Sequence, residues 1–346
     1  MGEVRIGTSG WSYPSGPGTW NGIFYPSRRS RPAGRPAKAE ELAYYAEHFE
    51  TVEVNSSFYR LPDPAVTKRW ADQTPAHFDF CLKLFQKFTH PSMHLKGAGS
   101  RSGEESPVPA VTRADVDAFR QAVDPLCSAG KLGAILVQFP PSFRHGDEAR
   151  DYLAWLMQAF SDYPVAVELR HRSWSDHEQG VIDVLKAHRA AWVQIDEPKF
   201  RFSIRQSRLP NLRSLYYMRL HGRNAEKWWT HDHPDERYNY LYSPAEIGGF
   251  ADTVSQVRQL VQKIYVFMNN HFAGKAVANA AALRHAVGQP VPGCYEGEML
   301  ARYPFLEGIV QRSGSDWLFD GLEEAREGTW PPGGTRTAED AEPRED

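Results

Sequence analysis

Carboxylate and imidazole side chains occur near the carboxyl ends of several short apolar segments of this sequence. Glu53, Glu168 and Asp196 supply the carboxylates, and His221 supplies the imidazole. Two carboxylates at a suitable separation can act as general acid and general base, as in glycoside cleavage or proton abstraction. A histidine in the same place can carry protons, although a lone histidine is often a structural donor. These four are therefore the candidate catalytic residues.

A second set of polar side chains has the chemistry needed to hold a substrate beside those four. Arg170, Arg219 and Lys83 can bind an anionic group or keep a nearby carboxylate ionised. In residues 269–280 a strand end is followed by Gly274 and then by the start of a helix. This pattern is typical of the site that binds phosphate in many barrels. The alternative is that Gly274 is needed only for close packing. The candidate binding residues are Asn55, Arg60, Lys83, His90, Gln138, Arg170, Trp174, Arg219, Asn269, Asn270 and Gly274.

Eight short segments rich in β-branched and aromatic residues alternate with helical patterns, which is typical of βα units and a parallel sheet. Eight such units predict an α/β fold with a single (β/α)8 TIM-type barrel. We expect strands at residues 4–11, 51–59, 78–85, 132–139, 165–170, 191–196, 214–221 and 263–271. We expect helices at residues 39–49, 64–73, 113–129, 147–160, 176–188, 244–262 and 275–287. Residues 197–213 hold two prolines and weak periodicity, so this quarter of the barrel should be irregular.

The alternation of side chains along a strand predicts which polar groups face the barrel interior. The pairs that share a face are Glu53 with Asn55, Glu168 with Arg170, Gln194 with Asp196, and Arg219 with His221. All lie near strand ends, so a closed barrel should bring them to one mouth, where the long insertions 12–38, 87–112 and 222–243 also lie. The alternative is a self-satisfied salt-bridge network under the loops, since burying unpaired charge costs several kcal/mol.

The overall composition describes an ordinary soluble globular chain. Hydrophobic residues make up 41%, charged residues 24%, and the net charge is −3, so a nucleic-acid partner is unlikely unless it meets a local basic patch. Three scattered cysteines, no basic and apolar leader and no long apolar run favour a cytoplasmic protein without a membrane span. We assign residues 1–320 to the barrel and residues 321–346 to a disordered charged tail.

Several ordered motifs resemble one protein family. They include IGTSGW at residues 6–11, TVEVNSSFYR at 51–60, ELR at 168–170 with Ser173-Trp174, YMRLHG at 217–222 and Asn269-Asn270 with Gly274. Together with Lys83, Gln138 and Asp196, this pattern is similar to the YecE-like proteins, domain of unknown function 72, over about residues 4–287. The resemblance implies a β/α barrel and leaves the reaction open, because the family has no settled activity.

The leading hypothesis is a lyase, isomerase or hydrolase that uses acid–base carboxylates on a small polar molecule, with anionic molecules included. One alternative is a metal-dependent phosphodiesterase acting on nucleic acid, with Glu53, Glu168, Asp196, His221 and His271 as ligands for a divalent metal. No close ligand spacing supports that metal, so no cofactor is predicted. The other alternative is a ligand-binding or scaffold protein without turnover. The oligomeric state stays open.

Overall fold

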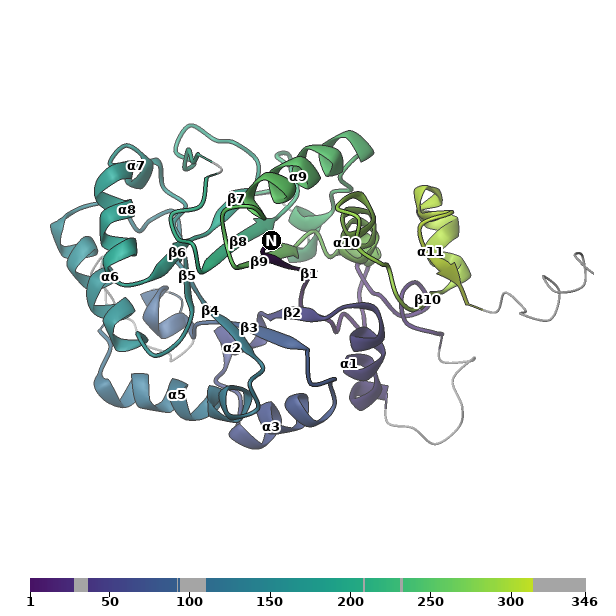
Figure 1. Ribbon diagram of the computed structural model, residues 1–346, viewed down its shortest axis with the longest axis horizontal. Coiled ribbons are helices and arrows are strands. Elements are labelled where there is room, and N and C mark those ends of the chain that lie inside the picture. Colours follow the sequence, from purple (N-terminus) through teal and green to yellow (C-terminus); the bar gives the residue numbers. More distant parts are fainter. Residues whose placement is uncertain (28–36, 92, 94–109, 208, 231–232, 314–346) are drawn as a thin grey trace, which may run out of the picture.

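The computed structural model describes residues 1–27, 37–91, 93, 110–207, 209–230 and 233–313, and parallel strands form its centre (Figure 1). The sheet runs in the order β6-β5-β4-β3-β2-β1-β9-β8-β7, with every pair parallel. Its strands are β1 Glu3–Ser9, β2 Thr51–Val54, β3 Asp79–Lys83, β4 Leu132–Gln138, β5 Val165–Glu168, β6 Ala190–Trp192, β7 Gln194–Asp196, β8 Leu215–Leu220 and β9 Lys263–Met268. The predicted α/β barrel is confirmed.

The barrel closes within the segment predicted as its sixth strand. That segment is divided at Val193, so that β6 pairs with β5 while β7 pairs with β8. The Val193 backbone N–H still donates to the Val167 carbonyl at 2.9 Å. Nine observed strands therefore correspond to the eight predicted ones, with one strand shared between the two edges of the sheet.

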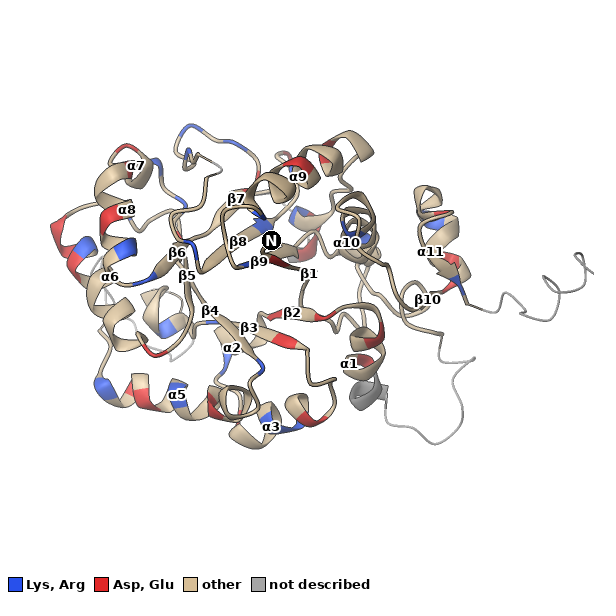
Figure 2. Ribbon diagram, in the orientation of Figure 1, with Lys and Arg blue, Asp and Glu red and all other residues tan. Residues whose placement is uncertain are grey.

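The outer helices lie where the apolar periodicity predicts them, around the strands in Figure 1. They are α1 Ala37–His48, α3 Pro64–Asp72, α5 Arg113–Ser128, α6 Asp147–Ala159, α8 Glu178–Ala187, α9 Pro244–Val257 and α10 Lys275–Ala286. Capping boxes fix two of the starts, Thr112 with Asp115 before α5 and Ser243 with Glu246 before α9. Charges of both signs alternate along α3 and α5 (Figure 2), as expected for solvated faces.

The second half of the second predicted strand differs from the structure, whereas the region predicted to be irregular agrees with it. Residues 55–59 were expected to continue the second strand, but Ser56–Tyr59 form the short helix α2. Ser57 decides this turn, because its hydroxyl donates to the carbonyls of Val54 and Lys83 at 2.9 and 2.7 Å. The irregular quarter is confirmed, since the described part of residues 197–213 contains no helix.

Short elements complete the strand ends and the C-terminal part of the chain. They are η1 Gln86–Phe88, α7 Arg172–Ser175, η2 Pro234–Tyr238, η3 Phe272–Gly274, β10 Cys294–Tyr295, α11 Gly297–Arg302, η4 Pro304–Leu306 and β11 Gln311–Arg312. Tyr295 is buried against Phe24 and His48 and fixes this C-terminal part beside α1. The predicted tail, residues 321–346, lies outside the described residues, as do parts of all three insertions. None of the described helices is long and apolar enough to span a bilayer.

Aromatic side chains fill the barrel below its mouth. Tyr265 and Phe267 project from β9 and stack at 5.9 Å, with Tyr217 of β8 between 5.3 and 6.0 Å from both. Gly133 leaves room for this layer, because a Cβ there would lie 2.6 Å from the Tyr265 hydroxyl. The charged groups of the mouth therefore rest on a packed aromatic floor that excludes water from beneath.

Candidate active site

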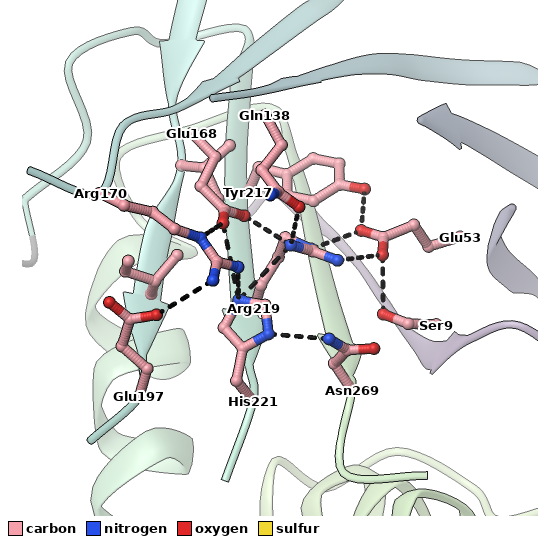
Figure 3. Close-up of polar contacts among 12 residues, drawn as sticks. Ser9, Glu53, Gln138, Glu168, Arg170, Glu197, Tyr217, Arg219, His221 and Asn269 are labelled. Carbon is pink, nitrogen blue, oxygen red and sulfur yellow. Dashed lines mark hydrogen bonds and ion pairs between the residues drawn. The ribbon is translucent and has the colours of Figure 1, made fainter. Parts of the chain in front are cut away.

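Arg219 occupies the centre of the mouth between two carboxylates (Figure 3). Its Nε and Nη2 donate to the two oxygens of Glu53 at 2.8 and 2.6 Å, and Nη1 donates to Glu168 at 2.6 Å. All three side chains are at most 1% exposed. The fork of the guanidinium matches a carboxylate geometrically, so this is a strong charge-assisted pair.

Neighbouring hydroxyls hold Glu53 in place from the other side. Ser9 at the end of β1 donates to one carboxylate oxygen at 2.7 Å, and Tyr217 donates to the other at 2.8 Å. With the guanidinium, each oxygen of Glu53 accepts two hydrogen bonds. Glu53 is thus a fixed anion that orients Arg219, and its carboxylate does not line the cavity above.

Arg170 forms a second layer of ion pairs above Glu168. Its Nε donates to Glu168 at 2.6 Å, and its Nη1 lies 3.4 Å from an oxygen of Glu197. Its Nη2 lies 3.2 Å from Nε2 of His221. Because a guanidinium can only donate, Nε2 of His221 is the acceptor of this bond, and Nδ1 of the same ring lies 2.8 Å from the side-chain amide nitrogen of Asn269.

These contacts decide which of the carboxylates can exchange a proton. Burial alone would raise the pKa of Glu168, but Arg219 and Arg170 outweigh it and hold that pKa well below its usual range. Burial raises the pKa of Glu197, and Arg170 offsets this only in part. Glu168 is therefore a permanent anion, whereas Glu197 is the carboxylate of the cluster that is easiest to protonate.

A cavity of about 490 Å³ opens above this cluster. Seven of the predicted binding residues line it: Asn55, Lys83, His90, Gln138, Arg170, Arg219 and Asn269. Its described wall also contains Tyr13, Phe58, Tyr59, Met93, Pro140, Pro141, Trp228, Trp229, Asp235, Arg237, Tyr238 and His271. A concave site with an aromatic wall and a few convergent polar groups is the usual form of a small-molecule site.

Lys83 is the lining residue whose charge is least compensated. Its Nζ lies 3.9 Å from the centre of the Phe58 ring, and no carboxylate of the described residues lies within 4.0 Å of it. Burial, followed by the charge of Arg219, lowers the pKa of Lys83 to about 7. An amine in this condition exchanges protons near neutral pH and is partly unprotonated there.

The three buried histidines at the mouth are neutral at pH 7. Burial lowers the pKa of His90, His221 and His271 to about 3 in each case, and nearby cations add to the effect at His90 and His221. They therefore act as hydrogen-bonding groups and not as charges. His221, predicted to be catalytic, supports Arg170 and does not line the cavity.

The structure corrects the predicted position of Asp196. Its oxygens accept hydrogen bonds from Arg223 at 2.7 and 2.8 Å and from Tyr242 at 2.9 Å. It lines a separate cavity of about 590 Å³ beside Met218 and Leu220. The reason is the register: Asp196 pairs with Leu220, which points away from the barrel interior, whereas Ile195 pairs with the inward Arg219.

Four other predicted binding residues also lie away from the cavity. Asn270 donates to the Tyr240 carbonyl at 2.8 Å and orders that loop. Trp174 is buried and donates to the Phe143 carbonyl at 2.8 Å. Arg60 is exposed. Gly274 has φ +80° and packs against Ile23, so it starts α10 in a left-handed conformation without lining the mouth.

Residue-by-residue alternation could have found Tyr217, which sequence reasoning missed, whereas Glu197 also required the register between two strands. Tyr217 is two residues before Arg219 on the same strand, so it shares the inward face. Glu197 is two residues after Ile195, which becomes the inward position once the register with β8 is known. Ser9 ends β1 and carried no charge to mark it.

The described residues give no grouping suited to a metal ion. No three His, Cys, Asp or Glu side chains among them gather in a way that could hold one. Glu53 and Glu168 are occupied by Arg219, while Asp196 is directed elsewhere. The residues considered as a metal set therefore do not converge.

Fold and site together define a TIM-like α/β barrel with a polar cavity at the carboxyl ends of its strands. The family model described as "Protein of unknown function DUF72" matches residues 5–300. The chain therefore belongs to the DUF72 family, and the resemblance read from the motifs is confirmed.

One curated relative and two solved structures match most of this chain, and a second curated relative matches a short part of it. The UPF0759 protein YunF of Bacillus subtilis is 28% identical over 291 residues, covering 80% of this chain and 92% of the relative. The UPF0759 protein YecE of Escherichia coli K12 is 45% identical over 49 residues, which are 14% of this chain and 18% of the relative. A crystal structure of a DUF72 family protein from Thermotoga maritima has a TM-score of 0.67 at 30% identity, covering 83% of this chain and 99% of that one. A DUF72 family protein from Enterococcus faecalis, with a TM-score of 0.67 at 24% identity, shares the fold.

Proposed function

We propose that this protein is a barrel enzyme that binds a small anionic molecule in the mouth cavity and converts it by acid–base chemistry. The observation that carries the proposal is the separation of charge around the cavity. Lys83, Arg170, Arg219 and Arg237 line its described wall, against one lining carboxylate, Asp235. Glu53, Glu168 and Glu197 lie behind these cations.

The site also contains a hydrogen-bond acceptor that a polar ligand could use. Oδ1 of Asn55 is buried and has no hydrogen-bond partner among the described residues. A buried acceptor without a partner costs roughly 1–3 kcal/mol, which a ligand donor would remove. An anion with a hydroxyl group would satisfy both Asn55 and the cationic wall.

In this proposal Lys83 takes the acid–base role in place of the carboxylates named from the sequence. Glu53 and Glu168 are held by Arg219, so their contribution is to fix the cations. Lys83, whose pKa is lowered to about 7, is suited to take or give a proton at neutral pH. Isomerases and lyases that remove a proton beside a carbonyl use a base of this kind.

The test is stabilisation by small anions followed by a search for turnover. Inorganic phosphate, sugar phosphates and 2-oxo acids should raise the Tm of the wild-type chain, because a ligand that binds only the folded state stabilises it. Lys83→Met should lose most of this rise. Lys68→Met is the matched control, since Lys68 is exposed and pairs with Asp72 on α3. An equal rise in Lys83→Met would contradict the proposal, and binding without turnover of any stabilising anion would leave a binding protein.

A further inference from the structure

We propose that Lys83 is a nucleophile that forms an imine with the carbonyl carbon of a small anionic aldehyde or ketone. This deepens the proposed function, on which it rests, by naming the substrate class and the atom that attacks. The inference begins with the position of the amine, at the end of β3 on the wall of the mouth cavity. Residues at the ends of barrel strands are where catalytic groups of this fold occur.

The described residues hold the amine in a defined place, and none of their carboxylates forms an ion pair with it. Ser57 of α2 donates to the Lys83 carbonyl at 2.7 Å, which ties α2 to the end of β3. Phe58, the next residue, thereby lies 3.9 Å from Nζ, and His90 packs edge-on against that ring at 4.8 Å. An aromatic face attracts the ammonium yet accepts no proton from it, so the amine can lose its proton to a substrate or to water.

Cationic neighbours keep the amine reactive at neutral pH. Burial and the charge of Arg219 lower the pKa of Lys83 to about 7, so a substantial fraction is the free amine. A lysine activated by burial and by another cation is the known route to a nucleophilic amine. Arg170 lines the same cavity and supplies a guanidinium for the anionic group of the ligand.

The reaction balances without any further reactant. The nitrogen lone pair of Lys83 forms a bond to the carbonyl carbon, and an N–H proton passes to the oxygen to give a carbinolamine. The carbon–oxygen bond then breaks, and the oxygen leaves as water with the second N–H proton. The products are one imine and one water. The imine withdraws electrons from the adjacent carbon, which makes a proton there easier to remove, in keeping with isomerase or lyase chemistry.

Reductive trapping on the intact protein tests this directly. The chain is incubated at pH 7 with sodium cyanoborohydride and either glyoxylate or glycolaldehyde phosphate, and the modified peptides are measured by mass spectrometry. We expect about one adduct per chain, on Lys83, formed at least about tenfold faster than on the exposed Lys68 and slowed by inorganic phosphate. Trapping with one probe alone would identify the anionic group as carboxylate or phosphate.

Lys83→Arg separates the imine from anion binding, because it keeps the charge and removes the nucleophile. This variant should give no adduct at position 83 and should still be stabilised by inorganic phosphate. If phosphate stabilises the wild-type chain but Lys83 is labelled no faster than Lys68, the imine is ruled out and the proposed anion site stands. If phosphate gives no stabilisation and Lys83 shows no preference, both fail. Should Lys83→Arg not fold, the rate of wild-type labelling against pH decides: it must level off above about pH 7.

Discussion

The two ends of the barrel both carry ion-pair networks, but they are built differently. At the amino ends of the strands, Arg5 approaches Glu3, Glu50 and Asp79, and Lys263 approaches Glu3 and Asp79. The side chains of Glu3 and Glu50 are 49% and 38% exposed, so water shares in solvating them. These ion pairs connect β1, β3 and β9 and are partly solvated.

At the carboxyl ends of the strands, the charged side chains are buried, and the carboxylates lie in a layer beneath the cations. Glu53 and Glu168 are fully buried beneath Arg219, and the cations face a cavity. A buried pair gives little net stability compared with apolar packing, so stability alone does not explain why such groups are present. The comparison shows that the ion pairs at the amino end are shared with solvent, whereas the buried ion pairs at the mouth lie beneath cations that line a cavity, as the proposed ligand site requires.

The largest expected effect is a difference in stability between two variants, each of which removes the central arginine of one network. Arg219→Met leaves Glu53 and Glu168 buried without their partner and should lower the free energy of unfolding by roughly 3–5 kcal/mol. Arg5→Met removes contacts to partly exposed carboxylates and should cost about 1 kcal/mol. Urea unfolding at pH 7 measures both. Equal losses would mean that the two networks are energetically alike.

The next largest effect is the pH dependence of stability that comes from a neutral histidine at the mouth. Burial lowers the pKa of His271 to about 3, so as the pH falls below about 6.5 the unfolded chain takes up a proton that the folded chain does not. Stability due to this group is thus present above about pH 6.5 and lost progressively toward pH 3, by about 2 kcal/mol between pH 6.5 and 5.

The variant His271→Asn should show a loss of unfolding free energy between pH 7 and 5 that is smaller than in the wild-type chain by about 2 kcal/mol. His285→Asn, at an exposed position on α10, is the matched control and should behave as the wild type does. A wild-type slope retained in His271→Asn would place the acid sensitivity elsewhere.

The smallest expected effect concerns Asp196. Asp196→Asn weakens its bonds to Arg223 and Tyr242 and should cost about 1 kcal/mol of unfolding free energy. Because Asp196 faces away from the mouth, stabilisation by inorganic phosphate should be unchanged. A loss of that stabilisation would return Asp196 to the ligand site and weaken the distinction between the two cavities.

Local patterns determined much of the architecture in advance. The boundaries of α3 and α5 follow from caps and apolar periodicity, and those of α6 from apolar periodicity alone; both are properties of neighbouring residues. The inward parity of Glu53 and Arg219 follows in the same way from alternation within one strand. The family motifs placed these residues in one barrel, and that barrel is confirmed.

Contacts between strands decided what the sequence alone could not. The inward side of residues 194–197 depends on the register of β7 with β8, which excludes Asp196 from the mouth and admits Glu197. The pairing of Arg219 with Glu53 and Glu168 depends on distances across the barrel, and so does the absence of a carboxylate of the described residues beside Lys83. Charge and burial act through space and not along the chain, so only the tertiary structure decides which carboxylates are paired with arginine and which cations line the cavity.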